Sequence, residues 1–154
     1  VNQPPVGGQI ADGNTQRARI SVATTSIGWA VALADGQVLG ALELLLVGPT
    51  GQNERRRNLS EFSADGYISL VSPANHDRLG LIHVSPLLNQ RSRFVGLNKT
   101  TLSTSDQQDS IFGWTPSAFH AAAYGDVILL AAIRNNENAI YLSRLDARGR
   151  RACP

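Results

Sequence analysis

The sequence predicts an all-β fold built from three repeated units of antiparallel strands. Two observations predict it. Short runs rich in Val, Ile, Leu and Ala recur with Gly, Asn, Asp and Pro between them, and no window shows an apolar stripe of helical period. These runs also return three times in the same order and at similar spacing. A repeat of this length made only of strands is typical of a propeller blade or another radially repeated β unit.

Length and composition indicate one globular domain. The chain has 154 residues, of which 42% are hydrophobic and 17% charged, the balance of an ordinary domain with a core of its own. Residues 1–16, VNQPPVGGQIADGNTQ, are rich in Pro, Gly, Asn and Gln and predict a flexible tail, which leaves 17–154 for the domain. No stretch approaches the roughly 20 apolar residues of a membrane-spanning helix.

Three apolar strands that each begin with Gly provide the frame of the repeat. They lie at 28–34, 66–72 and 125–131, and a second apolar run follows each of them at 42–48, 79–85 and 139–145. A lighter strand precedes each pair at 19–25, 58–64 and 117–123. The units therefore cover about 19–57, 58–116 and 117–154, and the second contains an insertion at 92–116. The start of the insertion, RFVGLNK, predicts an outer strand, and TTLSTSDQQDS predicts a polar loop.

The last repeat resembles a known kind of β unit. A light strand, a Gly-led apolar strand, a turn and the run AIYLSRLDARGR (139–150) are similar to the blades of β-propellers in large bacterial secreted or surface proteins. In those proteins a strand ending in an Arg-Leu-Asp-x-x-Gly-like turn recurs once per blade. The resemblance implies a propeller-like fold and an extracellular or cell-surface location.

The number of units leaves the architecture open. Three are fewer than the four to eight blades of a typical ring. The units would therefore form part of a propeller or complete one by assembly. A β-trefoil is an alternative fold, and so is a β-sandwich or jelly roll.

Charge argues against a nucleic-acid partner. The net charge is only +2, whereas nucleic-acid binders concentrate a larger positive surplus on one face. The densest basic run is Arg55, Arg56 and Arg57, and a second group follows at the end of the chain, at Arg148, Arg150 and Arg151. We take the first run as a candidate contact for a partner.

No group of residues points to catalysis, a metal or a cofactor. The sequence lacks a Gly-x-Ser-x-Gly elbow, a phosphate-binding glycine pattern and a Cys/His zinc cluster, and its sole cysteine is Cys153. His83 lies in an apolar run on the same side as Leu79 and Leu81, which predicts a half-buried, hydrogen-bonded side chain.

The aromatic residues are the remaining candidates for binding. Trp29 and Tyr67 each follow a lead Gly, which predicts equivalent positions in two units, and Trp114 lies in the insertion, where an exposed Trp would suit a partner contact. We therefore expect a non-catalytic scaffold or protein-interaction module that uses rim loops at 50–58 and 98–116, with a protein partner or self-assembly. One alternative is a carbohydrate-binding or glycan-acting domain that uses Trp29, Tyr67 and nearby acidic residues. The other is a structural subunit of a filament or capsid.

Overall fold

The computed structural model confirms the all-β prediction. It describes residues 19–34, 41–64, 66–85, 92–114, 116–134, 137 and 139–152, so the expected tail at 1–16 and Cys153 lie outside the described residues. This part of the chain forms strands, turns and bends. It contains no helix of the length and apolar character that crossing a membrane requires.

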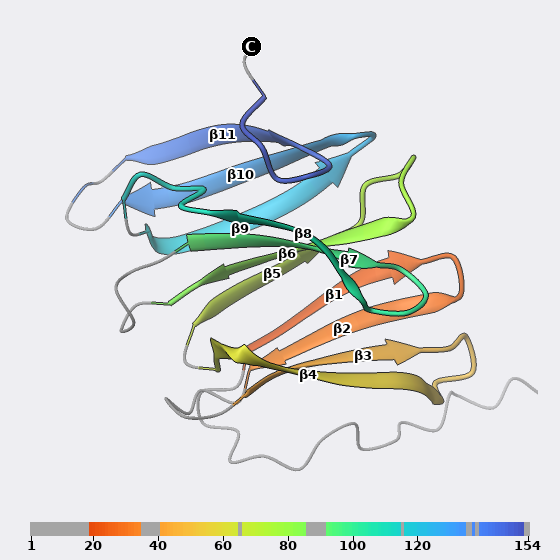
Figure 1. Ribbon diagram of the computed structural model, residues 1–154. Coiled ribbons are helices and arrows are strands. Elements are labelled where there is room, and N and C mark those ends of the chain that lie inside the picture. The colour runs from red at the N-terminus through yellow and green to blue at the C-terminus, as the bar shows by residue number, and fades with distance from the viewer. Residues whose placement is uncertain are drawn as a thin grey trace, which may run out of the picture.

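The strands form three antiparallel sheets in chain order, each a simple meander (Figure 1). Sheet A consists of β1 (Arg19–Thr25), β2 (Gly28–Ala34), β3 (Ala41–Val47) and β4 (Asn53–Ser63). Sheet B consists of β5 (Tyr67–Val71), β6 (Arg78–Val84), β7 (Ser92–Asn98) and β8 (Thr104–Asp109). Sheet C consists of β9 (Pro116–Tyr124), β10 (Val127–Arg134) and β11 (Ile140–Asp146).

The three sheets are stacked face to face, and the middle one is covered on both sides. Figure 1 shows them as successive layers, with sheet A in orange and yellow, sheet B in green and sheet C in blue. Leu42, Leu44 and Leu46 of sheet A pack against Leu79 and Leu81 of sheet B in one core cluster. A second cluster joins the other face of sheet B to sheet C; its members include Ile82, Val84, Phe94, Ile128, Leu130 and Leu145. A sandwich has two packed sheets, so this three-layer stack differs from that alternative.

The first strands of the three sheets lie closest to one another. β5 contacts both β1 and β9, and it also contacts β2. The hydroxyl of Ser21 on β1 accepts a hydrogen bond from the Leu70 amide on β5 at 2.8 Å. On the other side, the Ala74 amide donates to the carbonyl of Gly125 at 2.9 Å. Backbone and side-chain hydrogen bonds therefore reinforce apolar packing where the inner strands meet.

The second repeat unit differs from the expectation. Residues 58–63, expected to open that unit, belong to β4, because Asn58 and Leu59 pair with Glu43 and Leu42 of β3. Sheet B begins at Tyr67 instead. The strand led by Gly66 is therefore the first of its sheet, whereas those led by Gly28 and Gly125 are the second.

The expected insertion is part of sheet B rather than an addition to it. Residues 92–98, expected as an outer strand, form the third strand, β7. Residues 104–109, expected within a polar loop, form the fourth, β8. The rim loop expected at 50–58 is likewise largely strand, because β4 begins at Asn53.

Sheet C ends in a tight turn that locks it onto sheet B. The Asp146 carboxylate accepts hydrogen bonds from the amides of Arg148 and Arg150 at 2.8 and 2.9 Å. Gly149 has a left-handed φ of +77° and packs directly against the ring of Phe94. After the turn, Arg151 pairs with Leu145 in an isolated antiparallel bridge, at the edge where sheets A and B carry a fourth strand.

Candidate functional site

The three consecutive arginines do not form one patch, because alternation along β4 sends them to opposite faces of sheet A. Arg56 lies opposite Leu45, and its guanidinium forms a two-point ion pair with Glu43. Arg57 lies opposite Leu44 and donates a hydrogen bond to the Leu102 carbonyl of sheet B. Arg55, on the side of Arg57, is exposed. Two of the three candidates therefore have intramolecular partners.

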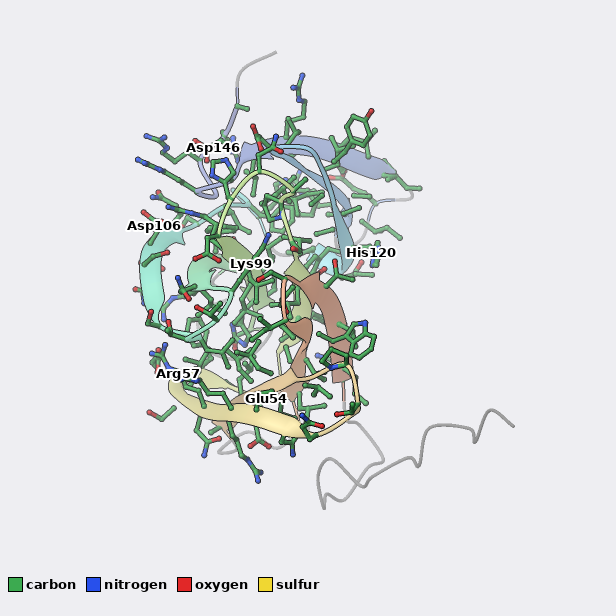
Figure 2. All side chains as sticks on the ribbon, turned by 90° about the vertical axis from the view of Figure 1, so that its right-hand side faces the viewer. Glu54, Arg57, Lys99, Asp106, His120 and Asp146 are labelled. Atoms are coloured by element: carbon green, nitrogen blue, oxygen red, sulfur yellow. The ribbon has the colours of Figure 1, made fainter. Side chains whose placement is uncertain are left out.

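The second arginine group lies at the far end of the stack. Arg150 pairs with Asp146 at 3.0 Å, and Arg151 donates to the Ile111 carbonyl at 3.4 Å. Figure 2 shows Arg57 and Asp146 at opposite ends of the molecule, separated by sheet B. The structure does not bring the two basic groups together, and each of them helps to hold an end sheet to the middle one.

Trp29 and Tyr67 do not occupy equivalent positions. Trp29 lies on β2, beside Thr24 of β1, on the side of sheet A that faces away from sheet B, and it is exposed. Tyr67 lies on β5 and packs partly into the core between sheets B and C. The guanidinium of Arg19 lies over its ring, 3.8 Å from the centroid. Because the two rings belong to different sheets, and Trp29 is exposed on the outer face of sheet A while Tyr67 packs toward sheet C, they do not form a shared sugar-stacking platform.

Trp114 is part of an aromatic cluster rather than an exposed loop residue. Its ring lies 5.4 Å from that of Phe112 and 5.2 Å from that of Tyr141, and Phe112 also approaches Phe119. The cluster packs beside the core that joins sheets B and C. The hydroxyl of Tyr141 donates to Glu137, and this hydrogen bond to the carboxylate raises the pKa of Tyr141.

The titratable residues in the described segments serve packing and cross-linking. His83 lies on the predicted face with Leu79 and Leu81, and its Nε2 lies 2.8 Å from the Ser63 carbonyl, which confirms the predicted hydrogen bond. Its side chain is buried rather than half-buried, and its ring meets Phe62 edge-on. Lys99 is also buried, and its ammonium donates to the Pro73 carbonyl at 2.9 Å. Desolvation lowers the pKa of Lys99, against the opposing charge of Asp77. Among the described residues, no three His, Cys, Asp or Glu side chains gather in a way that could hold a metal ion.

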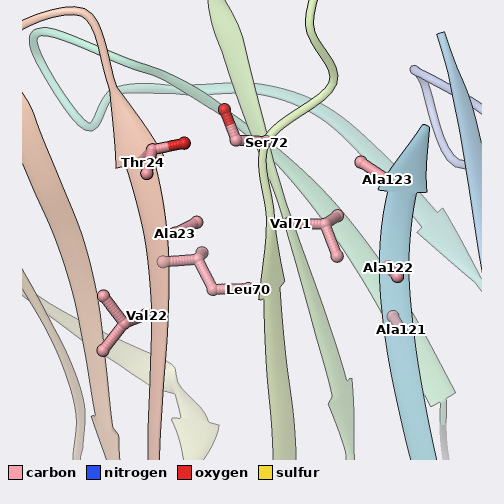
Figure 3. A pocket seen from close by; sticks show the side chains of 9 residues that line it. All are labelled: Val22, Ala23, Thr24, Leu70, Val71, Ser72, Ala121, Ala122 and Ala123. Atoms are coloured by element: carbon pink, nitrogen blue, oxygen red, sulfur yellow. The ribbon is translucent and has the colours of Figure 1, made fainter. Parts of the chain in front are cut away.

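A groove of about 260 Å³ runs between the first strands of the three sheets. Its walls are small side chains, and its two hydroxyls, Thr24 and Ser72, lie near the same end in Figure 3. The remaining lining residues are Val22, Ala23, Leu70, Val71, Ala121, Ala122 and Ala123. None of them is titratable. The groove therefore offers a bound ligand an apolar surface and two hydroxyl groups.

The largest exposed apolar surface lies on the side of sheet C that faces away from sheet B. We call it the open C face. It comprises Tyr124 on β9, Leu129 and Ile133 on β10, and Ile140 and Leu142 on β11, all exposed. The pairing register places these five side chains on one face, because Leu142 lies opposite Ala131, Ile140 opposite Ile133, and Tyr124 opposite Val127.

Sheet A presents a smaller surface of the same kind at the other end of the stack. Ile20 and Val22 on β1 and Trp29 on β2 are exposed on the side away from sheet B, and we call them the open A strip. Farther out on the same side, Val31, Leu45 and Val47 form a separate buried cluster. The exposed part of this face is thus confined to the inner strands.

Comparisons with protein families, curated proteins and solved structures found no match. The geometry of the chain therefore carries the functional argument by itself. The sequence did not predict the open C face or the open A strip, although Trp29, which lies in the open A strip, was among the predicted binding residues. The available signal was the run VILLAAIR (127–134), which is apolar at almost every position and so indicates a strand with two apolar faces.

Proposed function

We propose that this chain is a non-catalytic, propeller-like scaffold that associates with protein through the open C face. The observation that carries the proposal is the exposure of five large apolar side chains on one sheet face. Contiguous apolar patches of this kind on a protein surface are typical of protein–protein contacts. The resemblance to blades of secreted and surface propellers favours an extracellular setting.

The chemistry of the surface supports a protein partner over a sugar. Tyr124, Leu129, Ile133, Ile140 and Leu142 present a wide aliphatic surface with one aromatic ring. A sugar site gathers a few fixed polar side chains into a pocket, whereas this face carries two exposed polar side chains, His120 opposite Ala131 and Arg144 opposite Leu129, beside its apolar residues on one sheet surface. Sheet faces in this chain pack on other sheet faces, so a second sheet is the surface that the open C face fits best.

Sedimentation velocity on a concentration series of the purified chain tests this proposal. We expect a discrete complex to form at concentrations up to about 100 µM, where an interface with a Kd of about 10 µM is mostly occupied. Leu142→Glu places a charge on the open C face and should weaken association at least about 100-fold. Gln107→Glu is the matched control, because it adds the same carboxylate at an exposed position of β8 in the middle sheet.

The outcome is read in two steps. Association that Leu142→Glu disrupts and Gln107→Glu leaves intact supports the proposal. Wild-type association that is indifferent to Leu142→Glu overturns the proposal, and a chain that stays monomeric over the whole series overturns association with a second copy.

A further inference from the structure

Sheets A and C can be compared position by position, because both begin with a two-residue hairpin. In sheet A the last pair before the turn is Thr25 and Gly28, and in sheet C it is Tyr124 and Val127. Counting from these pairs aligns β1 with β9 and β2 with β10. The register across to the third strand then aligns β3 with β11.

The open C face corresponds to the face of sheet A that sheet B covers. Leu44 lies opposite Ala32 in sheet A, and Leu142 lies opposite the equivalent Ala131 in sheet C. Leu44 is 1% exposed and Leu142 is 78% exposed. Two other aligned pairs differ in the same direction: Leu42 with Ile140, and Ala30 with Leu129. Sheet C is therefore apolar but uncovered at these positions, whereas the buried Leu46 of sheet A aligns with the exposed Arg144.

The open A strip shows the converse relation. Val22 aligns with Ala121, and their exposures are 54% and 6%. Trp29 aligns with Ile128, and Ile20 aligns with Phe119. Ile128 is buried against sheet B, and Phe119 packs against the same core. Sheet A therefore exposes side chains at positions that, in sheet C, contact the preceding sheet of the stack.

We propose that the open C face of one copy packs on the open A strip of a second copy, head to tail, and that two copies close a ring of six sheets. This rests on the proposed function, of which it names the partner. The chain already makes this kind of contact twice, between sheets A and B and between sheets B and C. Sheet A packs on sheet B through the face that aligns with the open C face, and sheet C packs on sheet B through the face that aligns with the open A strip. Among the described residues, the outer face of sheet C is exposed on β9, β10 and β11, whereas the outer face of sheet A is exposed at the open A strip and already buried at Val31, Leu45 and Val47.

The proposed number of copies uses the sheets that the described residues form. Closed rings of this kind contain about four to eight sheets, so two copies of these three sheets fall in that range and three copies do not. The contact would join the open A strip, on β1 and β2 of one copy, to the open C face, on β9, β10 and β11 of the other. Because Val31, Leu45 and Val47 are already buried, the second copy would meet this face of sheet A only at the exposed side chains of β1 and the first part of β2.

Complementation between two defective variants tests the arrangement. Val22→Glu damages the open A strip, and Leu142→Glu damages the open C face. A head-to-tail contact needs one intact surface of each kind, so each variant should be monomeric alone, with association at least about 100-fold weaker than wild type. An equimolar mixture should form a heterodimer through its one intact pair of surfaces. The wild type should stop at twice the monomer mass in sedimentation equilibrium.

Other results overturn the proposal in distinguishable ways. If Val22→Glu still dimerises and Leu142→Glu does not, two open C faces pack on each other; the proposed function then survives and the head-to-tail ring does not. A mixture of monomeric variants that remains monomeric also excludes the head-to-tail contact. Wild-type polymers that grow with concentration would replace the ring by a filament. Ile20→Glu and Ile140→Glu form a second pair, and circular dichroism checks that every variant is folded.

Discussion

The second strands of the middle sheet and of the last sheet are both largely apolar but have different surroundings. β6 of sheet B and β10 of sheet C are both apolar on their two faces, and β6 is covered on both, whereas β10 is covered on one. Apolar side chains on both faces are what a strand requires when it lies between two layers. Sheet C therefore has the composition of an inner layer at the end of the stack, and this mismatch is the basis of both proposals.

Replacing one leucine in each of the two sheets should give the largest difference in the free energy of unfolding. Leu81 of the middle sheet is fully buried, and Leu142 of sheet C is exposed. We expect Leu81→Ala to lower the free energy of unfolding by about 2–5 kcal/mol, because it removes buried methyl groups and leaves a cavity. Leu142→Ala should change it by less than about 0.5 kcal/mol in the monomer.

Urea denaturation at a protein concentration below that of assembly measures both variants. Equal losses would show that the open C face is already covered in the monomer, and the comparison between the sheets would fail. At assembling concentrations Leu142→Ala should become destabilising as well, because binding to a partner adds to apparent stability.

Gly149, in the turn that ends sheet C, tests the contact between sheet C and the middle sheet B. A Cβ there would lie 2.2 Å from ring carbons of Phe94 in the middle sheet, and φ is +77°. Gly51 is the matched control, because its φ is +86° and nothing lies within 4 Å of the added carbon. Left-handed strain costs about 1 kcal/mol at either position, and the collision with Phe94 adds roughly 1–3 kcal/mol at Gly149.

Chemical denaturation of Gly149→Ala and Gly51→Ala should therefore show the larger loss at Gly149. Amide hydrogen exchange should also become faster in β11 of that variant, because its turn no longer packs on sheet B. Similar losses for both variants would mean that the turn does not lock the two sheets together.

Local pattern was sufficient to predict the strands, because each strand's alternation is set by its own residues. The runs at 28–34, 42–48 and 79–85 overlap closely with β2, β3 and β6, and His83 makes the predicted hydrogen bond, although its side chain is buried rather than half-buried. The assignment of strands to units failed in the second repeat. Gly66 precedes an apolar run just as Gly28 does, but a strand's place in a sheet depends on its pairing partners, which are distant in sequence.

The candidate site was less predictable for the same reason. The prediction placed Trp29 and Tyr67 in equivalent positions because each follows a lead glycine. Since Trp29 lies on the second strand of its sheet and Tyr67 on the first strand of its own, the two rings occupy different positions. Arg55, Arg56 and Arg57 were treated as one group because the expected loop would not alternate, whereas β4 does. The open C face depends on which sheet covers which, and alternation along a strand shows that a face is apolar without showing what covers it.

The smallest expected effect concerns the charge that shapes the turn of sheet C. Burial by itself would raise the pKa of Asp146, but the amides of Arg150 and Arg148 and the guanidinium of Arg150 outweigh it and lower the pKa below the ordinary 3.8. Because the folded pKa lies below the unfolded one, the carboxylate stabilises the fold above about pH 3.8, and this contribution is lost as pH falls through the folded pKa.

Asp146→Asn keeps an oxygen that can accept the two amide hydrogen bonds but cannot titrate. We expect the variant to be less stable than wild type at pH 7 by under about 1 kcal/mol, since the group is partly exposed, and the difference to shrink toward about pH 2. Asp109→Asn, at the edge of the middle sheet, removes the same charge elsewhere. Unfolding measured at several pH values distinguishes the two variants. A loss of stability in Asp146→Asn that is constant with pH would mean that the turn depends on the shape of the side chain and not on its charge. The middle sheet would then differ from sheet C in burial alone.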